Sequence, residues 1–545
     1  MPNAMPPDAD QGLRGQPSRA ELVDRVAAGR PFDLVVIGGG ATGLGLAVDA
    51  AARGFSVALF EAEDFAKGTS SRATKLVHGG VRYLAQGDLK LVREALHERG
   101  LLLANAPHLV RPLPFTIPVY GLRGRLWDRL FYGAGLAAYD ALAGDLRLGP
   151  TRWLGRGPLL AAAPAVRRAG LVGGLRYWDA QFDDARLALA LARTAIRHGA
   201  CVVNHCRVTG LTRDSGVGRV TGVEVEERET LRRFQVAARC VVNATGVWVD
   251  GVRRMEDAAA GDLVAPSQGV HLVVDRGFFP ADAALLVPRT ADGRVLFAVP
   301  WEGSLILGTT DTPRRDLPLE PRPFAEEVDF ILREAGRYLE RPPTRADVRS
   351  AWAGLRPLVR PAAGTAAETQ RISREHLVVV SPAGLVSVTG GKWTTYRAMA
   401  EDVLEACFHA DLLPARPAGI TRTLPLVAAP RTAVGEPADA ISGPPGLQLY
   451  GTDAPVVASL PGAGREILPG LTEAMVRFAA RMEYARSVED VLARRSRWLF
   501  RDAAVAATAA GAVAEILAGE LGGTFSAAES AATFTRLAES YRLDS

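Results

Sequence analysis

The pattern of apolar and polar positions near the start of the chain predicts a β-α-β unit. Residues 33–37 (DLVVI) form a short apolar run of the kind found in buried strands. A glycine-rich turn and an alanine-rich helical segment follow as far as Arg53, and Gly54 ends that helix. The next apolar run, FSVALF at residues 55–60, is a second strand. This order is the repeating unit of parallel α/β sheets.

The residues before this unit predict a short helix behind a disordered lead. Residues 1–17 are the predicted disordered lead, and the first 30 residues have no apolar core of signal-peptide length, so we expect no secretory leader there. Ser18 and Glu21 have the spacing of a capping box, and Gly29 stands where a helix running through Ala28 would stop.

The middle of the chain, from about residue 85 to 380, mixes helical stretches with short alternating runs. These runs predict a second, largely antiparallel sheet. They are VNHCRVTGL, RVTGVEVEE, ARCVVNATG, GVHLVVD, RVLFAV, SLILGTTD and HLVVVS. Residues 411–470 are rich in Pro and Gly and predict extended chain, whereas residues 471–521 have a helical pattern with Ser487 and Asp490 as its N-terminal cap.

Composition is that of an ordinary globular protein. The 545 residues are 48% hydrophobic and 23% charged with a net charge of +4, which excludes a disordered chain and a strongly basic nucleic-acid binder. Four cysteines without a C-x-x-C pair predict neither a disulfide framework nor an iron–sulfur cluster, so a reducing compartment is the default. No run of about 18 apolar residues is present, so any membrane contact is peripheral.

Lysine is unusually rare. Only four of the 64 basic residues are lysines, and they are Lys67, Lys75, Lys90 and Lys392. Since arginine supplies the positive charge elsewhere, we interpret a lysine in this chain as a position with a specific chemical need.

The turn of the first β-α-β unit carries a dinucleotide-binding motif. Gly38 permits the tight turn, Gly40 lets backbone N–H groups approach a pyrophosphate, and Gly43 lets the helix pack on the strand. Glu61, at the end of the next strand, is placed to accept from ribose hydroxyls. Because a carboxylate would repel a 2′-phosphate, FAD or NAD fits better than NADP.

A second turn favours a flavin over NAD. Residues 241–246 (VVNATG) predict a strand that ends in the small-residue turn Ala244, Thr245 and Gly246. At this distance from the first motif, such a turn resembles the one by which flavoproteins return the chain to the nucleotide domain.

Two longer segments carry a resemblance to a known family. Residues 68–84 (GTSSRATKLVHGGVRYL) and 390–400 (GGKWTTYRAMA) resemble the two signatures of the aerobic, bacterial type of FAD-dependent glycerol-3-phosphate dehydrogenase. The segments 300–303 (PWEG), 308–311 (GTTD) and 354–357 (GLRP) match in the same order. Leu44, Ala73 and Ala85 depart from the commoner residues at their positions.

The resemblance implies an α/β fold with an added helical part. A Rossmann-like FAD-binding domain with a parallel sheet, an antiparallel-sheet substrate domain and a helical C-terminal domain are expected. We predict the lead and short helix over 1–30, the FAD-dependent oxidoreductase over 31–410 and the helical domain over 411–545. The FAD-binding part is expected to be discontinuous, with segments at about 31–105, 190–250 and 350–410.

The resemblance also implies the cofactor-binding residues and the reaction. We expect oxidation of sn-glycerol 3-phosphate to dihydroxyacetone phosphate by hydride transfer to FAD. The expected FAD ligands are Gly38, Gly40, Ala41, Thr42, Gly43, Glu61, Thr69, Ser70, Ser71, Lys75, Leu76, His78, Gly79, Gly80, Ala244, Thr245, Gly246, Gly354, Gly391, Lys392, Trp393 and Thr394. No residue is expected to hold a metal.

A set of cations is suited to a phosphorylated substrate. We assign phosphate binding to Arg82, Tyr83, Arg374 and Lys392, and stabilisation of the developing alkoxide to Arg356. The base that removes the C2 hydroxyl proton is assigned to His271 or His78, because the histidine pKa lies nearest to the working pH.

The electron acceptor is expected to be a membrane quinone. Residues 123–132 (RGRLWDRLFY) mix arginines with large apolar side chains, as a helix at a membrane surface does, although a helix edge packed in the core has the same pattern. The expected location is therefore the cytoplasm, peripheral on the inner face of the cell membrane. For the C-terminal helices, packing on the catalytic body, a homodimer contact and a lipid-facing role all remain open.

Three alternatives compete with this interpretation. A glycerol-3-phosphate oxidase would pass its electrons to dioxygen. Another FAD-dependent oxidase of the D-amino-acid oxidase type would share the architecture but would leave residues 68–80 unexplained. A non-catalytic or RNA-directed flavoprotein is disfavoured by the small net charge.

Overall fold

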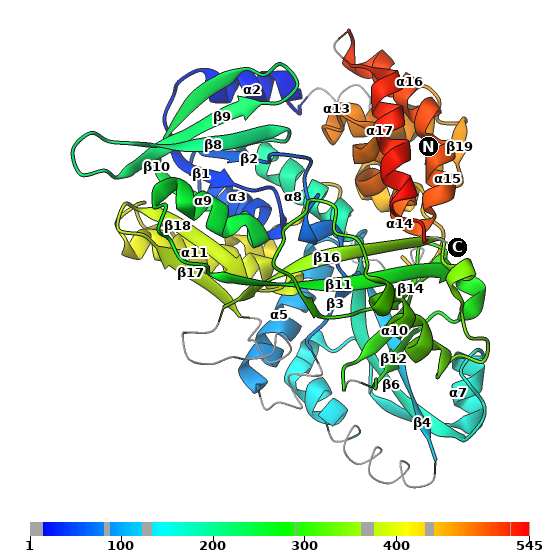
Figure 1. Ribbon diagram of the computed structural model, residues 1–545. Coiled ribbons are helices and arrows are strands. Elements are labelled where there is room, and N and C mark those ends of the chain that lie inside the picture. Colours follow the sequence, from blue (N-terminus) through cyan, green and yellow to red (C-terminus); the bar gives the residue numbers. More distant parts are fainter. Residues whose placement is uncertain are drawn as a thin grey trace, which may run out of the picture.

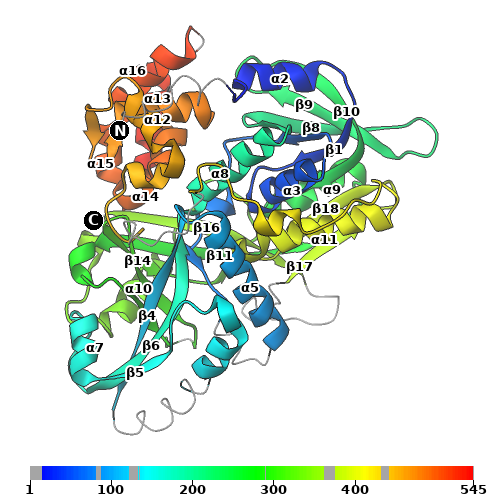
Figure 2. The same cartoon turned by 180° about the vertical axis from the view of Figure 1, so that it is seen from behind.

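The protein folds into two large sheets and a group of C-terminal helices. The computed structural model describes residues 15–80, 88–121, 133, 135–288, 290–291, 293–360, 375–430, 441–523 and 525–543. In Figure 1 the first sheet lies at the upper left, the second sheet runs below it, and the C-terminal helices stand at the upper right. Figure 2 shows the same three parts from behind. The predicted fold class, a parallel α/β part with an antiparallel sheet and a helical C-terminal part, is confirmed.

The first sheet is built around the predicted β-α-β unit. The central strands β1 (Phe32–Ile37), β2 (Val57–Phe60), β7 (Cys201–Val203), β10 (Arg233–Asn243) and β18 (Leu385–Gly390) run parallel, in the order β18-β10-β1-β2-β7. Helix α3 (Ala41–Ala52) connects β1 to β2. Strands buried on both faces need an almost continuous apolar run, and residues 34–37 of β1 are all buried.

Antiparallel strands extend this sheet. They are β8 (Cys206–Arg213), β9 (Val220–Glu227) and β17 (His376–Val380). The prediction that all seven alternating runs form the second, antiparallel sheet is therefore wrong for four of them, which belong to the first sheet. These four are VNHCRVTGL, RVTGVEVEE, ARCVVNATG and HLVVVS. An alternating pattern identifies a strand, but it carries no information about which strand will pair with it.

The second sheet is mostly antiparallel. Its strands are β3 (Leu76–Val77), β4 (Val110–Tyr120), β5 (Arg152–Gly155), β6 (Leu171–Phe182), β11 (Val264–Asp275), β12 (Ala284–Val287), β13 (Leu296–Trp301), β14 (Ser304–Gly308), β15 (Thr312–Pro313) and β16 (Ser350–Val359). Among the described strands of this sheet, only the contact of β12 with β4 is parallel. Strand β11 pairs with β16 along almost its whole length, from Val264 opposite Val359 to Val273 opposite Ser350.

The helices cover these sheets and form their own group at the C-terminal end. Those around the sheets are α2 (Arg19–Ala27), α5 (Leu89–Asn105), α7 (Arg156–Ala162), α8 (Asp184–Arg197), α9 (Val249–Glu256), α10 (Ala325–Gly336) and α11 (Tyr396–His409). The C-terminal unit contains α12 (Ala454–Ser459), the hairpin β19 (Glu466–Leu468) and β20 (Leu471–Thr472), α13 (Glu473–Met482), η10 (Asp490–Arg495), α14 (Trp498–Arg501), α15 (Ala503–Thr508), α16 (Ala510–Leu521) and α17 (Ala527–Glu539).

Both predicted helix caps form. The Ser18 side chain accepts from the Glu21 N–H while Glu21 accepts from the Ser18 N–H. Ser487 accepts from the Asp490 N–H at 3.1 Å, and the Asp490 carboxylate accepts from the Ser487 N–H. Each pair satisfies backbone donors that the first helical turn leaves without partners.

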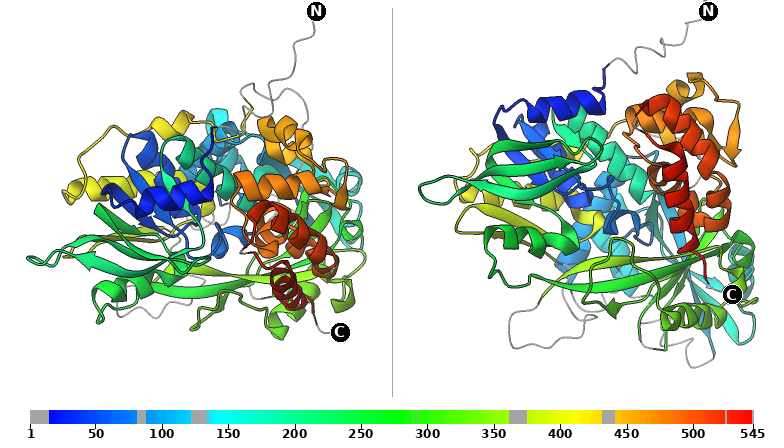
Figure 3. Two further views of the ribbon diagram at one scale, coloured as in Figure 1. Left: turned by 90° about the horizontal axis from the view of Figure 1, so that it is seen from above. Right: turned by 45° about the horizontal axis from the view of Figure 1, so that its top comes forward.

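The C-terminal unit packs on the two sheets, partly through buried charges. Asp64, just after β2, is fully buried and pairs with both Arg494 and Arg495. Further along, the N–H of Ala351 on β16 donates to the carbonyl of Tyr541 at 2.7 Å. Figure 3 shows the C-terminal helices beside the first sheet in both views and above the second sheet in the right view. Of the roles left open for these helices, packing on the catalytic body is the one seen here.

Candidate active site

The dinucleotide motif forms a tight turn between β1 and α3. Gly38 has a φ of +109°, a conformation that side chains disfavour. A Cβ on Gly43 would lie 2.0 Å from the Gly38 carbonyl oxygen, so the helix can pack this closely only with glycine there. Gly40 is the residue before α3 and has no side chain to cap it, which leaves N–H groups of the first turn for an anion.

Glu61, at the end of β2, accepts two backbone hydrogen bonds and so stabilises this turn. Its Oε2 accepts from the Gly39 N–H at 2.6 Å and its Oε1 accepts from the Glu63 N–H at 2.9 Å. Burial raises the pKa of Glu61 above 4.5, opposed by the two backbone N–H groups. Each carboxylate oxygen has a second lone pair, so the side chain can still accept from a ligand hydroxyl.

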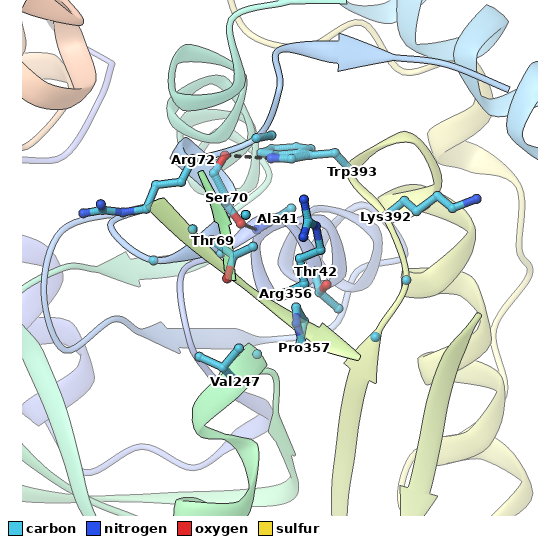
Figure 4. A pocket seen from close by; sticks show the side chains of 18 of the residues that line it. Ala41, Thr42, Thr69, Ser70, Arg72, Val247, Arg356, Pro357, Lys392 and Trp393 are labelled. Carbon is cyan, nitrogen blue, oxygen red and sulfur yellow. Dashed lines mark hydrogen bonds between the residues drawn. The ribbon is translucent and has the colours of Figure 1, made fainter. Parts of the chain in front are cut away.

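Ser70 joins the three predicted motifs. Its hydroxyl accepts from the Ala41 N–H at 2.9 Å, and its carbonyl accepts from the Trp393 indole at 2.7 Å, which is the dashed line in Figure 4. The neighbouring Thr69 donates its hydroxyl proton to the Leu355 carbonyl at 2.5 Å. The loop at residues 68–71 therefore ties the nucleotide turn to both the first and the second sheet.

A single large cavity runs between these elements. Its volume is about 1120 Å³, slightly above the ~300–1,000 Å³ usual for small-molecule and cofactor sites. It begins at the β1–α3 turn and Glu61, passes the loop at 66–80 and the turn at 244–248, and reaches His271 and Arg356 on the second sheet.

His271 and Arg356 lie on neighbouring strands and on one face. In the β11–β16 ladder His271 is opposite Trp352, and Gly269 is opposite Gly354. Because alternate residues of a strand share a face, Arg356 lies on the same side as Trp352. The guanidinium lies over Gly269, where a Cβ would be 2.3 Å from one of its nitrogens. Glycine there is what admits the arginine.

The imidazole of His271 is buried and held on two sides. Its ring stacks on Trp352 with ring centres 4.2 Å apart, and its Nε2 lies 2.9 Å from the Thr74 hydroxyl. Its Nδ1 has no hydrogen-bond partner among the described residues. Burial, together with the charges of Lys75 and Arg356, holds the pKa of His271 well below 6.5. The ring is therefore neutral near neutral pH and offers a lone pair.

Polar groups of the second sheet fix the direction of Arg356. One guanidinium nitrogen donates to the Thr310 carbonyl at 3.0 Å and another donates to the Thr309 hydroxyl at 3.1 Å. The Asp311 carboxylate lies 3.7 Å from the guanidinium. The segment 308–311, noticed in the sequence only as part of a resemblance, thus positions this arginine.

Most of the predicted residues line the cavity. They are Gly38, Gly40, Ala41, Thr42, Glu61, Thr69, Ser70, Leu76, His78, Gly80, Ala244, Thr245, Gly246, His271, Gly354, Arg356, Gly391, Lys392, Trp393 and Thr394. Arg82, Tyr83 and Arg374, and the segment 123–132, lie outside the described residues. The side chain of Lys392 extends away from Arg356 in Figure 4, so these two cations do not converge on one point.

Four predicted cofactor ligands lie behind the cavity wall. Gly43 packs against the turn, and Gly79 donates its N–H to the hydroxyl of Tyr139 at 2.8 Å. The ammonium of Lys75 is fully buried, 2.6 Å from Asp184, and it donates to the Ser71 carbonyl at 2.7 Å. In this structure these residues support the wall instead of facing the cavity.

Sequence reasoning missed the residues that hold His271 and Arg356. Trp352 was not singled out because a tryptophan in an apolar run looks like ordinary core. Gly269 is the first residue of the GVHLVVD run, and Thr74 lies inside the first signature. A glycine two residues before a candidate catalytic histidine on the same strand was the available signal, because such residues share a face.

The described residues fit FAD. The cavity joins the N-terminus of α3 to a carboxylate suited to a ribose. Gly40 supplies no side-chain cap there, and beyond the Ala41 N–H, which donates to Ser70, the first turn is suited to a pyrophosphate. From there it continues without interruption to the buried His271 and Arg356. Glycines at 38 and 40 keep side chains out of the path beside the turn.

Two family descriptions match the chain. Residues 33–397 match the family described as FAD dependent oxidoreductase. Residues 447–528 match the family described as the C-terminal domain of alpha-glycerophosphate oxidase. The second match covers most of the C-terminal unit.

Named relatives agree with these families. The chain is 39% identical over 535 residues to the probable mitochondrial glycerol-3-phosphate dehydrogenase of Caenorhabditis elegans, a match that covers 93% of this chain and 73% of the relative. It is 44% identical over 417 residues to the human mitochondrial glycerol-3-phosphate dehydrogenase, covering 74% of this chain but 56% of the relative. The chain thus spans little more than half the length of the mammalian relatives.

A solved structure shares the whole architecture. The X-ray structure of the glycerol-3-phosphate dehydrogenase from Bacillus halodurans, complexed with FAD, superposes with a TM-score of 0.74 at 30% identity, and the match covers 96% of both chains.

Proposed function

Since the chain belongs to the family of FAD-dependent glycerol-3-phosphate dehydrogenases, we propose that it oxidises sn-glycerol 3-phosphate to dihydroxyacetone phosphate. One observation carries this proposal. A nucleotide-binding turn and a buried pair formed by a neutral histidine and an arginine open into the same cavity.

The chemistry divides between the cofactor and the protein. When bound, FAD supplies the acceptor for the hydride that leaves C2 of the substrate. His271 takes the remaining proton from the C2 hydroxyl, so that one hydride and one proton leave the alcohol as it becomes a ketone. The depressed pKa supports His271 as the base, because a neutral imidazole keeps one lone pair, which lies on Nδ1 when the Nε2–H donates to Thr74. His78 lines the same cavity and is the second candidate.

The cationic side chains bind the phosphate of the substrate and stabilise the negative charge that develops on its C2 oxygen. Arg356 stabilises the oxygen of C2 as its proton leaves, and the two threonines that fix its guanidinium support that role. We assign the phosphate to Arg82, Tyr83, Arg374 and Lys392. A dianionic phosphate favours several cations over one.

We propose a membrane quinone as the electron acceptor, with the protein peripheral on the inner face of the cell membrane. The quinone expectation comes from the family resemblance. No helix in the described part of the chain is long and apolar enough to cross a bilayer. Glycerol-3-phosphate oxidase, with dioxygen as acceptor, is the second candidate, and the match of residues 447–528 to an oxidase C-terminal domain favours it.

Anaerobic mixing of the yellow holoenzyme with glycerol 3-phosphate tests the activity. We expect the flavin absorbance to bleach, and we expect a soluble quinone analogue to restore it faster than air does. Recovery that is faster in air identifies the oxidase, whereas a flavin that stays oxidised overturns the proposed substrate. Glycine and a D-amino acid serve as control substrates and should leave the flavin oxidised.

Flotation with liposomes tests the membrane contact separately. We expect the protein to float with vesicles made of bacterial polar lipids and to release at high salt, because arginine contacts with anionic lipid are screened. Protein that remains entirely at the bottom of the gradient, without quinone reduction, contradicts the membrane assignment.

A further inference from the structure

A buried cationic cluster lies directly behind the candidate base. The Lys75 ammonium is fully buried, lies 2.6 Å from Asp184 and is surrounded by three aromatic rings. Its nitrogen is 4.8 Å from the ring centre of Trp352, 5.5 Å from that of Trp301 and 5.5 Å from that of Phe500. Cations over such rings are attracted to their faces, most strongly when the site is desolvated.

Trp352 connects this cluster to His271. The indole stacks on the imidazole at 4.2 Å and faces the Lys75 ammonium at 4.8 Å. Thr74, the residue before Lys75, contacts the edge of the same imidazole. Lys75 has a φ of +63°, a strained conformation that persists only where the surroundings impose it. Two consecutive residues thus reach the histidine, one directly and one through the tryptophan.

The C-terminal unit completes the cluster. Arg497 donates to Asp184 at 3.1 Å and to the Ser71 carbonyl at 2.8 Å, and its guanidinium lies 4.4 Å from the ring centre of Phe500. Phe500 packs edge-on against Trp352 at 5.3 Å. The C-terminal helical unit carries no catalytic motif, yet it contributes Arg497 and Phe500 to the surroundings of Lys75.

Charges face His271 from two directions. Arg356 on β16 lies in the cavity with Asp311 beside it, and Lys75 lies behind the ring with Asp184 beside it. Burial and Arg497 lower the pKa of Lys75 to about 7, opposed by Asp184. Lys75 is thus protonated in the acid range, where its charge opposes protonation of His271.

We propose that Lys75 is a positioning residue that, through Trp352, fixes the His271 ring and keeps it in its neutral form. The inference rests on the proposed role of His271 as the base. It gives the C-terminal unit a part in catalysis, because Arg497 and Phe500 hold Lys75 in place.

Lys75→Met tests the electrostatic part of the proposal. Methionine keeps the length of the side chain but removes the charge, so His271 should accept a proton more readily. We expect its titration midpoint to rise by roughly one pH unit. Histidine NMR on the holoenzyme measures this directly, because the chain has only eight histidines and His271→Asn assigns the signal. The acid limb of the flavin-bleaching rate should move to higher pH by the same amount.

Two further variants separate charge from packing. In Lys75→Met/Asp184→Asn both charges are gone, so the shift should be smaller than in Lys75→Met alone. Lys90→Met removes an exposed lysine and should move neither the midpoint nor the acid limb. A folded, flavin-bound Lys75→Met protein with the wild-type midpoint and the wild-type acid limb overturns the proposal.

Trp352→Phe keeps the proposal testable if Lys75→Met fails to fold. A smaller ring loosens the stack on His271, so kcat should fall about tenfold or more while KM for glycerol 3-phosphate changes less than twofold. Unchanged kcat overturns the positioning role. If glycerol 3-phosphate fails to bleach the wild-type flavin, the proposed function is wrong, and the NMR midpoints still decide whether Lys75 controls His271.

Discussion

At the scale of single residues, the site depends on buried groups whose protonation is set by their surroundings. His271 is 2% exposed and lies beside an arginine and, through one indole, a lysine. A histidine in such a place stays neutral at a pH where an exposed histidine begins to take up a proton. The same burial that forms the wall of the cavity therefore keeps this imidazole neutral.

Replacing His271 by Asn should remove the base but keep the fold. We expect the rate of flavin reduction by glycerol 3-phosphate to fall by roughly 10²–10⁴-fold, the usual contribution of a general base. Stopped-flow absorbance under anaerobic conditions measures this rate. His409→Asn, an exposed position on α11, is the matched control and should leave the rate unchanged. If the rate of His271→Asn stays within a few-fold of the wild-type rate, His271 is not the base and His78 becomes the candidate.

A second buried histidine predicts how stability depends on pH. Burial, followed by the charges of nearby arginines, lowers the pKa of His108 to about 3. The unfolded chain then binds one more proton than the folded chain below about pH 6.5, so this histidine costs stability as the pH falls. Between pH 6.5 and 5 the wild type should lose about 1.6 kcal/mol in total relative to His108→Gln, with a slope that approaches ~1.4 kcal/mol per pH unit at the acid end. Urea unfolding at several pH values measures the difference, and parallel curves for the two proteins would contradict it.

The sequence identified the chemistry of the site better than its geometry. Gly38, Gly40, Glu61 and most of the 68–80 loop line the cavity, because each type of residue has a local reason to stand where it does. Lys75 is different, since its role depends on Asp184 and Arg497, which lie more than a hundred positions away in the chain. Nothing within the first signature indicates which way that lysine points.

At the scale of elements, the turn between β1 and α3 has no room for a side chain at Gly43. Gly43→Ala would place a Cβ 2.0 Å from the Gly38 carbonyl, and neither backbone segment can yield without disturbing β1 or α3. We expect the free energy of unfolding to fall by about 1–3 kcal/mol, the usual cost of overpacking, together with loss of bound FAD.

The control for this change is Gly519→Ala. Gly519 lies within α16 and has no atom within 4 Å of an added Cβ, so alanine there should be neutral or slightly stabilising. Thermal unfolding and the ratio of flavin to protein absorbance compare the two variants. Equal flavin content in both proteins would show that the turn tolerates a side chain.

Helices and strands were predicted well where the pattern of apolar and polar residues is regular, and poorly where prolines interrupt it. Strand β4 was not recognised because Pro112, Pro114 and Pro118 interrupt it, and prolines argue against a strand. Alternate residues point their N–H groups to the same side of a strand, so these prolines remove donors from one edge only. Pairing with β12 at only Phe115 and Thr116 fits this loss, whereas β6 pairs along the whole strand.

At the scale of the whole molecule, buried ion pairs join the C-terminal unit to the nucleotide part. Asp64 pairs with Arg494 and Arg495, all of them almost fully buried, and Lys67 pairs with Glu489 at 2.8 Å. These partners are more than 400 positions apart, which is why a hydrophobic pattern cannot predict the contact.

Asp64→Asn should therefore weaken the whole assembly. Arg494 keeps Glu489 and Asp490 as partners, but the buried Arg495 loses its carboxylate, so the free energy of unfolding should fall by about 3–5 kcal/mol. Asp24→Asn is the control, because it breaks an exposed pair with Arg232 and should change stability by less than about 1 kcal/mol. Denaturation followed by intrinsic fluorescence measures both. A similar effect in the two variants would mean that the buried pairs do not hold the units together.

The contact between Ala351 and Tyr541 has a consequence for shortened chains. The N–H that Tyr541 accepts belongs to the strand that carries Trp352 and Arg356, and the Tyr541 hydroxyl donates to Glu320, the partner of Arg72. In a chain that stops before Tyr541, β16 lacks this partner although Arg497 and Phe500 are already present. Such a chain would carry every signature motif, but the strand of Trp352 and Arg356 would lack one of its contacts.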